Sequence, residues 1–279
     1  MFENILLPLP SEYYPQIAVK RALDLASRFK SEITLQYIFE KQLMDKVDNV
    51  SAGAVPYQSL KEMEREMKKV ELNGESEVLF DRIEKFAQKR GVKLNKLVCS
   101  GTQTKEILKT IEKNKITLAI TEFHKEAVLK YRFLYESPIP VWIEHSGKKL
   151  EKIFGILTNL SPNKLVPAAA FNLSKKFGLP LKFYYVHDSS EPLEDSEEDL
   201  ARKELLIKLK NLRIKFKINF EFDVVFQEIG SFLNYYFKKE RSGLVILGRF
   251  KKPTMLPFFN LDRKIEVSKK LGANVLILR

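Results

Sequence analysis

The run Ile5-Leu6-Leu7-Pro8-Leu9 decides the fold, because it returns 148 residues later as Ile153-Phe154-Gly155-Ile156-Leu157. Each run is short, continuous and apolar, which is typical of a strand that is buried on both faces of a parallel sheet. The same shift places three apolar residues of the first copy, Ala22, Leu25 and Phe29, on Ala170, Leu173 and Phe177. A repeat of this length predicts two copies of one structural unit.

Each copy continues as strand, helix and strand. Helical spacing predicts an inward stripe of Ala18, Ala22, Leu25, Ala26 and Phe29 in the first copy, and of Val166, Ala169, Ala170, Leu173 and Phe177 in the second. Ser11 and Ser161 are candidate helix caps, and Pro15 and Pro162 stand near the expected helix starts. The second strands are expected at Ile33–Phe39 and Leu181–His187, which makes each unit a right-handed crossover.

Three further strands and a third helix follow in each copy. The expected strands are Lys93–Cys99, Ile116–Thr121 and Pro140–Ile143 in the first copy, and Asn219–Phe226, Gly243–Leu247 and Asn274–Leu278 in the second; the helices are Thr104–Lys113 and Ser231–Lys239. The fold class is therefore α/β, as two tandem five-stranded parallel, doubly wound, Rossmann-like domains. We expect domains at residues 1–146 and 151–279, a linker at 147–150, and two separate sheets that pair about a pseudo-twofold axis.

The composition is that of a packed globular protein, with 44% hydrophobic and 30% charged residues. The net charge is +12, of which residues 1–150 carry about +4 and residues 151–279 about +8. Interleaved Lys and Glu favour solvated helix faces, and they also suit a thermophile surface. The alternative is a working basic patch, from which we expect only weak, non-specific binding to nucleic acid.

The N-terminal residues lack the pattern of a signal peptide, and no apolar run is long enough to cross a bilayer. We therefore expect a cytoplasmic protein without membrane contact. The single Cys99 excludes an internal disulfide, and the three histidines, His124, His145 and His187, have no partner at metal-ligand spacing. No metal site is expected.

These elements, twice over, resemble the universal stress protein family. The opening run Ile5–Leu9 is similar to the first strand of that family, and Leu244–Arg249 and Gly272–Arg279 are similar to its fourth strand and C-terminal end. The resemblance implies an adenine nucleotide alpha hydrolase-like fold and a stress-related or regulatory protein, often dimeric. It also implies that ATP binds, in many members, through a G-x2-G-x9-G-[S/T] loop after the fourth strand and an Asp at the end of the first strand.

This chain departs from that nucleotide motif. Gly248 matches the first glycine, but Lys251, Leu261 and Asp262 stand where the motif needs Gly, Gly and Ser or Thr, and Glu122 replaces the first glycine in the first copy. The strand-end Asp is Pro10 in the first copy and Thr158 in the second. Without the glycines the backbone cannot approach phosphates closely. We expect no cofactor, and an altered site for ATP or AMP in the second domain is the alternative.

Other candidates have a structural and a functional interpretation. His187 and Cys99 each stand at the end of an expected strand, and the group Phe232, Tyr235, Tyr236 and Phe237 has helical spacing, so packing is favoured over ligand contact or base stacking. The apolar loop Lys251–Phe259 caps the core or contacts a partner. No catalytic pair or nucleophile constellation is present.

Two functions follow from these residues. The first is a non-enzymatic regulatory or interaction protein with an unidentified protein partner. Its two domains would pair within the chain, and a homodimer is compatible with this function. The second is a nucleotide-binding sensor whose altered site would use Thr158, His187, Gly248, Arg249 and Lys251.

Overall fold

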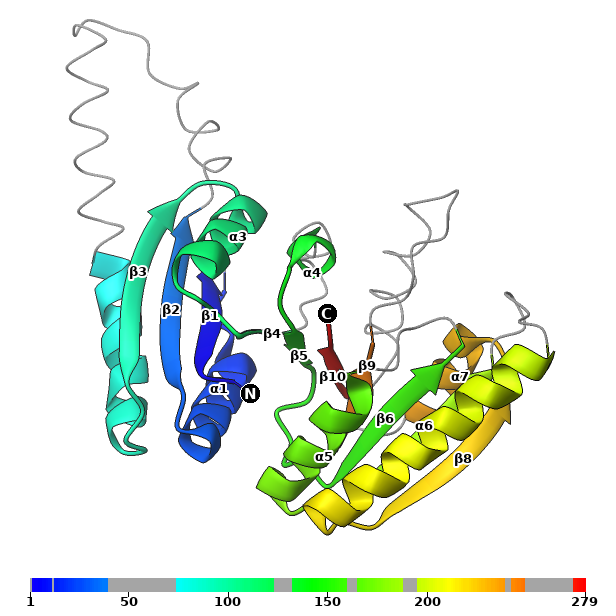
Figure 1. Cartoon of the computed structure of the whole chain (residues 1–279). Helices are drawn as coiled ribbons and strands as arrows, with labels where there is room; N and C mark the ends of the chain where they lie inside the picture. Colours follow the sequence, from blue (N-terminus) through cyan, green and yellow to red (C-terminus); the bar gives the residue numbers. More distant parts are fainter. Residues whose placement is uncertain are drawn as a thin grey trace, which may run out of the picture. The chain divides into compact units, whose positions relative to one another are not determined.

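The computed structural model describes residues 2–11, 13–39, 74–122, 132–159, 165–187, 195–238, 242–248 and 273–279 (Figure 1). The strands are β1 (Asn4–Pro10), β2 (Glu32–Phe39), β3 (Leu94–Ser100), β4 (Leu118–Glu122), β5 (Val141–Glu144), β6 (Lys152–Thr158), β7 (Leu181–His187), β8 (Phe220–Phe226), β9 (Gly243–Leu247) and β10 (Asn274–Ile277). The helices are α1 (Gln16–Phe29), α3 (Gln103–Lys113), α4 (Arg132–Glu136), α5 (Val166–Phe177), α6 (Asp195–Phe216) and α7 (Ile229–Phe237), and residues 74–88 are also helical.

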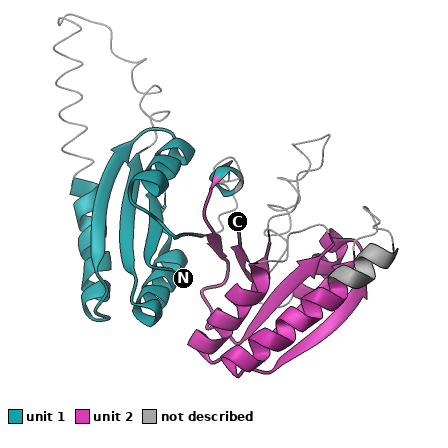
Figure 2. Ribbon diagram, in the orientation of Figure 1, with its two compact units in different colours: residues 1–120, 129–136 teal, residues 121–128, 137–279 magenta. Residues whose placement is uncertain are grey.

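Hydrogen-bonded neighbours place the ten strands in the order β3-β2-β1-β4-β5-β10-β9-β6-β7-β8. Within each copy the first strand pairs in parallel with the second and fourth, and the second with the third. The predicted fold class, α/β with two tandem, doubly wound copies of one unit, is confirmed. The chain forms two compact units: residues 1–120 with 129–136, and residues 121–128 with 137–279 (Figure 2).

The last strand of the first copy belongs to the second compact unit. There β5 pairs antiparallel with β10, with Val141 opposite Ile277, Trp142 opposite Leu276 and Ile143 opposite Val275. This register gives the strand pair a local twofold centred on Trp142 and Leu276. Two separate sheets, predicted from the sequence, are not found, because the edges of the two equivalent last strands satisfy each other's backbone groups.

Helices cover both faces of the sheet in the first unit, and alternate residues of β2 show it. The Tyr37 hydroxyl bonds Glu75 of the 74–88 helix at 3.0 Å, whereas the Gln36 amide donates to the Glu106 carbonyl of α3 at 3.0 Å. The inward stripe predicted for α1 is buried, except for the half-buried Phe29. The predicted Ser11 cap is wrong: Pro15 occupies the cap position and no side chain caps the helix. Ser161 and Pro162 lie outside the described residues.

The second unit has the same two layers, with aromatic side chains on both sides of β7. Phe183 packs toward α5 against Phe171 at 5.7 Å between ring centroids, and Tyr184 packs toward α7 against Phe232 at 5.2 Å. Most of the stripe predicted for α5 is buried. Pro167, which the prediction did not include, is also buried in the first turn of that helix. The bounds of β7 and β9 are those predicted from the sequence.

Candidate functional site

The carboxyl ends of β6, β7 and β9 bring three of the five predicted site residues to one edge of the second unit. Thr158 is the last residue of β6 and pairs in register with Val186, the residue before His187. Ile156 of β6 pairs with Leu247, so Gly248 follows β9 one step further along the same edge. In doubly wound sheets, ligands bind outside the carboxyl ends of the strands. Arg249 and Lys251 lie outside the described residues.

The three residues at this edge differ in what they offer a ligand. Thr158 is 1% exposed and Gly248 is buried, while His187 is half-buried with its ring 5.4 Å from that of Phe226. Just before Gly248, the Leu247 carbonyl accepts a hydrogen bond from the Leu278 backbone at 2.8 Å. One hydroxyl, one imidazole and a glycine that allows close backbone approach are therefore gathered here, without a carboxylate among them.

The equivalent strand ends of the first copy carry different residues. β1 ends in the buried Pro10, which has no N–H to donate, and β4 ends in Glu122, whose carboxylate repels phosphate. The backbone after β1 is also committed, because Ser11 donates to the Ile38 carbonyl at 3.2 Å.

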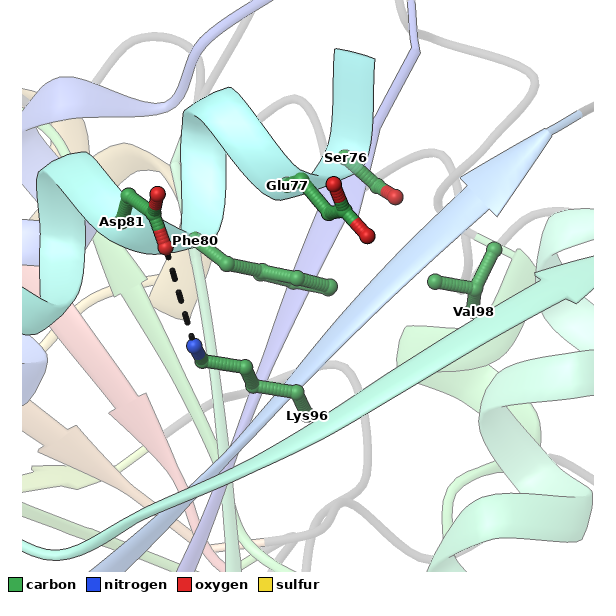
Figure 3. Close-up of a pocket in the computed structure, with 6 residues that line it drawn as sticks. All are labelled: Ser76, Glu77, Phe80, Asp81, Lys96 and Val98. Atoms are coloured by element: carbon green, nitrogen blue, oxygen red, sulfur yellow. Dashed lines mark ion pairs between the residues drawn. The ribbon is translucent and has the colours of Figure 1, made fainter. Parts of the chain in front are cut away.

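A hollow of about 390 Å³ lies elsewhere in the first unit, between the 74–88 helix and β3 (Figure 3). Six residues line it: Ser76, Glu77, Phe80, Asp81, Lys96 and Val98. The Lys96 ammonium lies 3.9 Å from Asp81 and 2.6 Å from Glu84, so its charge is already paired. The hollow offers Phe80 and Val98 as apolar surface. The sequence had singled out none of these residues.

Cys99 is half-buried at the end of β3, in a packing environment as predicted. Its sulfur accepts a hydrogen bond from the Gln36 amide at 3.3 Å and donates to the Tyr37 carbonyl at 3.5 Å. Burial raises the pKa of the Cys99 thiol, which disfavours the reactive thiolate. Sequence reasoning missed Gln36, a fully buried amide that ties β2 to β3 and α3.

The aromatic group on α7 divides between core and surface. Phe232 and Phe237 are buried as predicted, and the half-exposed Tyr236 packs its ring on Phe232 at 4.7 Å between centroids. Tyr235 is 80% exposed, so packing is the wrong interpretation for this tyrosine. Within the described ranges, no group of three or more His, Cys, Asp and Glu side chains could hold a metal ion. No helix in the same ranges is long and apolar enough to cross a bilayer.

Comparisons with solved structures show the same fold over nearly the whole chain. A universal stress protein from Archaeoglobus fulgidus DSM 4304 is 14% identical with a TM-score of 0.63, covering 98% of this chain and 96% of that one. A putative universal stress protein from Pseudomonas aeruginosa UCBPP-PA14 is 12% identical with a TM-score of 0.62, covering 99% and 93%. No curated protein matches the sequence. The sequence model of the universal stress protein family matches residues 1–142, and the chain therefore belongs to the universal stress protein family.

Proposed function

We propose that this chain is a non-enzymatic, stress-related regulatory protein of the cytoplasm, which acts by binding a protein partner and does not use nucleotide. The observation that carries the proposal is the pair of strand ends Pro10 and Thr158, at the place where nucleotide-binding relatives have an aspartate. Neither residue supplies a carboxylate. The sequence after β9 adds Lys251, Leu261 and Asp262 in place of the glycines and hydroxyl of the phosphate loop.

The structure also supports the proposed pairing of the two sequence copies within one chain. The antiparallel register of β5 and β10 joins the last strand of one copy to the last strand of the other. Trp142 is fully buried in this pair, and its ring N–H donates to Glu144 at 2.7 Å. A permanent pair of this kind takes the place of an interface between two separate chains.

A second candidate function is a nucleotide sensor, favoured by the meeting of Thr158, His187 and Gly248 at one strand edge. In that case the Thr158 hydroxyl and the backbone after β9 would hold the nucleotide, with Arg249 and Lys251 as cations for its phosphates. Asp262 works against this function, because a carboxylate in the phosphate position repels a triphosphate by about 1 kcal/mol or more.

Thermal unfolding with and without millimolar ATP and magnesium separates the two functions. A ligand at 100 times its dissociation constant stabilises a fold by about 2.7 kcal/mol, which raises the melting temperature of a chain this size by several degrees. We expect essentially no shift with ATP or with AMP. A clear shift that Thr158→Ala abolishes, while Ser100→Ala at the end of β3 keeps it, would establish the sensor and contradict the first proposal.

A further inference from the structure

The sheet ends at β3 in the first unit, so the outer edge of this strand has no neighbouring strand among the described residues. Two hydrogen bonds show which residues of β3 face β2. The Lys93 carbonyl accepts from β2 at 2.9 Å, and the Gly101 backbone N–H donates to β2 at 3.0 Å. Because backbone groups alternate along a strand, odd-numbered residues point to β2 and even-numbered ones point outward. The N–H and C=O groups of Lys96 and Val98 are therefore available to a further strand.

The hollow beside β3 lies next to these outward groups. The side chains of the same two residues, Lys96 and Val98, line it together with residues of the 74–88 helix (Figure 3). Phe80 of that helix is 4% exposed and Val98 is 46% exposed, so the hollow has apolar surface beside the strand. In an added strand every second side chain points to this face of the sheet. The hollow can therefore receive a side chain of a strand that binds at the edge.

The rim of the hollow is acidic, although the net charge of the chain is +12. Glu77 and Asp81 line the hollow on the helix side (Figure 3). The ammonium of Lys96, the basic residue of the lining, already lies 2.6 Å from Glu84. Glu77 forms no ion pair with any other described residue. The carboxylates around the hollow thus attract a further cation.

We propose that the outer edge of β3 binds an extended segment of a partner protein as an added strand, with one arginine side chain of that segment in the hollow. The inference rests on the proposed function, since it gives the chemistry of the protein partner. The methylene groups of the arginine pack on Phe80 and Val98, and its guanidinium lies at Glu77 and Asp81. Backbone hydrogen bonds to the edge supply affinity and the hollow supplies selectivity. A planar guanidinium also pairs with a carboxylate through two hydrogen bonds, which an ammonium does not.

The other outer strand of the sheet, β8, is equivalent to β3 but lacks this acidic rim. Val98 pairs with Tyr37 and Val224 with Tyr185, which are equivalent in the repeat, so the two valines are equivalent as well. The helix before β8, α6, contains four basic and no acidic residues in its part 205–216. An arginine is attracted to the first edge and repelled from the second. Phosphate groups of nucleic acid or lipid are repelled from the edge of β3.

A fluorescent heptapeptide, Ser-Thr-Val-Arg-Val-Thr-Ser, tests the site on the full chain. Fluorescence anisotropy should show saturable binding, which becomes weaker as salt is added. The same peptide with Glu in place of Arg should bind about tenfold or more weakly, because its carboxylate meets carboxylates. Methylation of the Arg nitrogen and of the next backbone nitrogen removes a donor that faces β3 in either register, and it should weaken binding about as much. Equal affinities for the Arg and Glu peptides, or no binding at millimolar Arg peptide, would overturn the proposal.

Variants of the chain place the peptide on β3. Val98→Pro removes an outward N–H and keeps the bonds to β2, since an edge strand tolerates proline where its N–H faces solvent. It should weaken binding of the Arg peptide about tenfold or more. Val224→Pro makes the same change on β8 and should leave binding unchanged. Glu77→Gln should weaken binding severalfold, whereas Glu112→Gln at an exposed position of α3 should not. Equal effects within either pair of variants would contradict the assignment.

Two further results distinguish this inference from the proposed function. Self-association of the wild-type chain that Val98→Pro abolishes would assign the edge of β3 to a second copy and overturn the inference. A melting shift with ATP would contradict the proposed function even where the Arg peptide binds. Failure of the Arg peptide overturns only the inference, because it leaves the melting result with ATP as it is.

Discussion

One position of the repeat is filled in different ways by the two copies. In the first copy Leu7 of β1 lies beside Leu35 of β2, and both are fully buried. In the second copy the equivalent neighbours are Gly155 of β6 and Phe183 of β7. A Cβ atom added to Gly155 would overlap the Phe183 ring, so the ring occupies the space that the missing side chain leaves.

The difference extends to the helix that covers each pair. Leu23 of α1 and Phe171 of α5 are equivalent in the repeat, and both are buried. Phe171, Phe183, Phe216 and Phe220 form an aromatic cluster with ring centroids 5.6–5.7 Å apart. The two copies thus keep the same pattern of buried positions but divide the volume differently, and residues that contact each other must change together.

The largest effect should come from forcing the first copy's residue into the second copy. Gly155→Leu overfills the space beside Phe183 and should lower the free energy of unfolding by about 3 kcal/mol. Adding Phe183→Leu recreates the Leu7–Leu35 pair and should recover much of that loss. Urea unfolding of the wild type, Phe183→Leu, Gly155→Leu and the double variant measures the coupling. Additive losses, with the double variant below both single ones, would show that the two residues do not share one space.

The repeat pattern predicted those parts of the fold that depend on local apolar spacing. The second strand of the second copy, Leu181–His187, and most of the helix stripes were predictable because each buried face repeats with the period of its element. The meeting of Thr158, His187 and Gly248 at one edge of the sheet was also predictable. Each of them ends or directly follows an apolar run, and the carboxyl ends of parallel strands lie at the same edge.

Features that depend on distant partners could not be predicted in this way. The pattern of Val141–Glu144 is that of a buried strand in either direction, so it carried no signal for the antiparallel partner β10. The exposed Tyr235 and the buried Phe232 lie in one short apolar run, and only the position of α7 on the sheet separates them.

An intermediate effect should come from the side chain that joins the two equivalent last strands. Asn274 of β10 is fully buried, and its oxygen accepts hydrogen bonds from the backbone of His145 at 2.9 Å and of Ser146 at 3.4 Å. Pro140, at the equivalent place before β5, has no such acceptor. Asn274→Leu removes the acceptor from two half-buried donors and should cost about 1–3 kcal/mol of unfolding free energy. Chemical denaturation should show a much smaller loss for Asn95→Leu, whose bond to Glu32 is exposed. Equal losses in the two variants would show that Asn274 does not hold the strands.

The smallest effect concerns a position of the second strand that is charged only in the second copy. Lys182 lies 2.7 Å from Asp223 and 3.3 Å from Glu221, whereas the equivalent residue of the first copy is the buried, uncharged Thr34. The hydrogen bond to Asp223 raises the pKa of Lys182. A raised pKa in the folded state stabilises the fold fully below the unfolded pKa of about 10.4, and this contribution is lost only as pH rises through the folded value.

Asp223→Asn should therefore cost less than about 1 kcal/mol, because half of the Asp223 side chain is exposed and its charge is screened. The loss should be the same at pH 7 and pH 9, where Lys182 stays protonated, and should shrink as salt is added. Denaturation at both pH values, in low and high salt, measures it, with Glu32→Gln as a control at the exposed Lys93 pair of the first copy. A loss at pH 7 that salt leaves unchanged would mean that Asp223 acts through packing and not through the charge of Lys182.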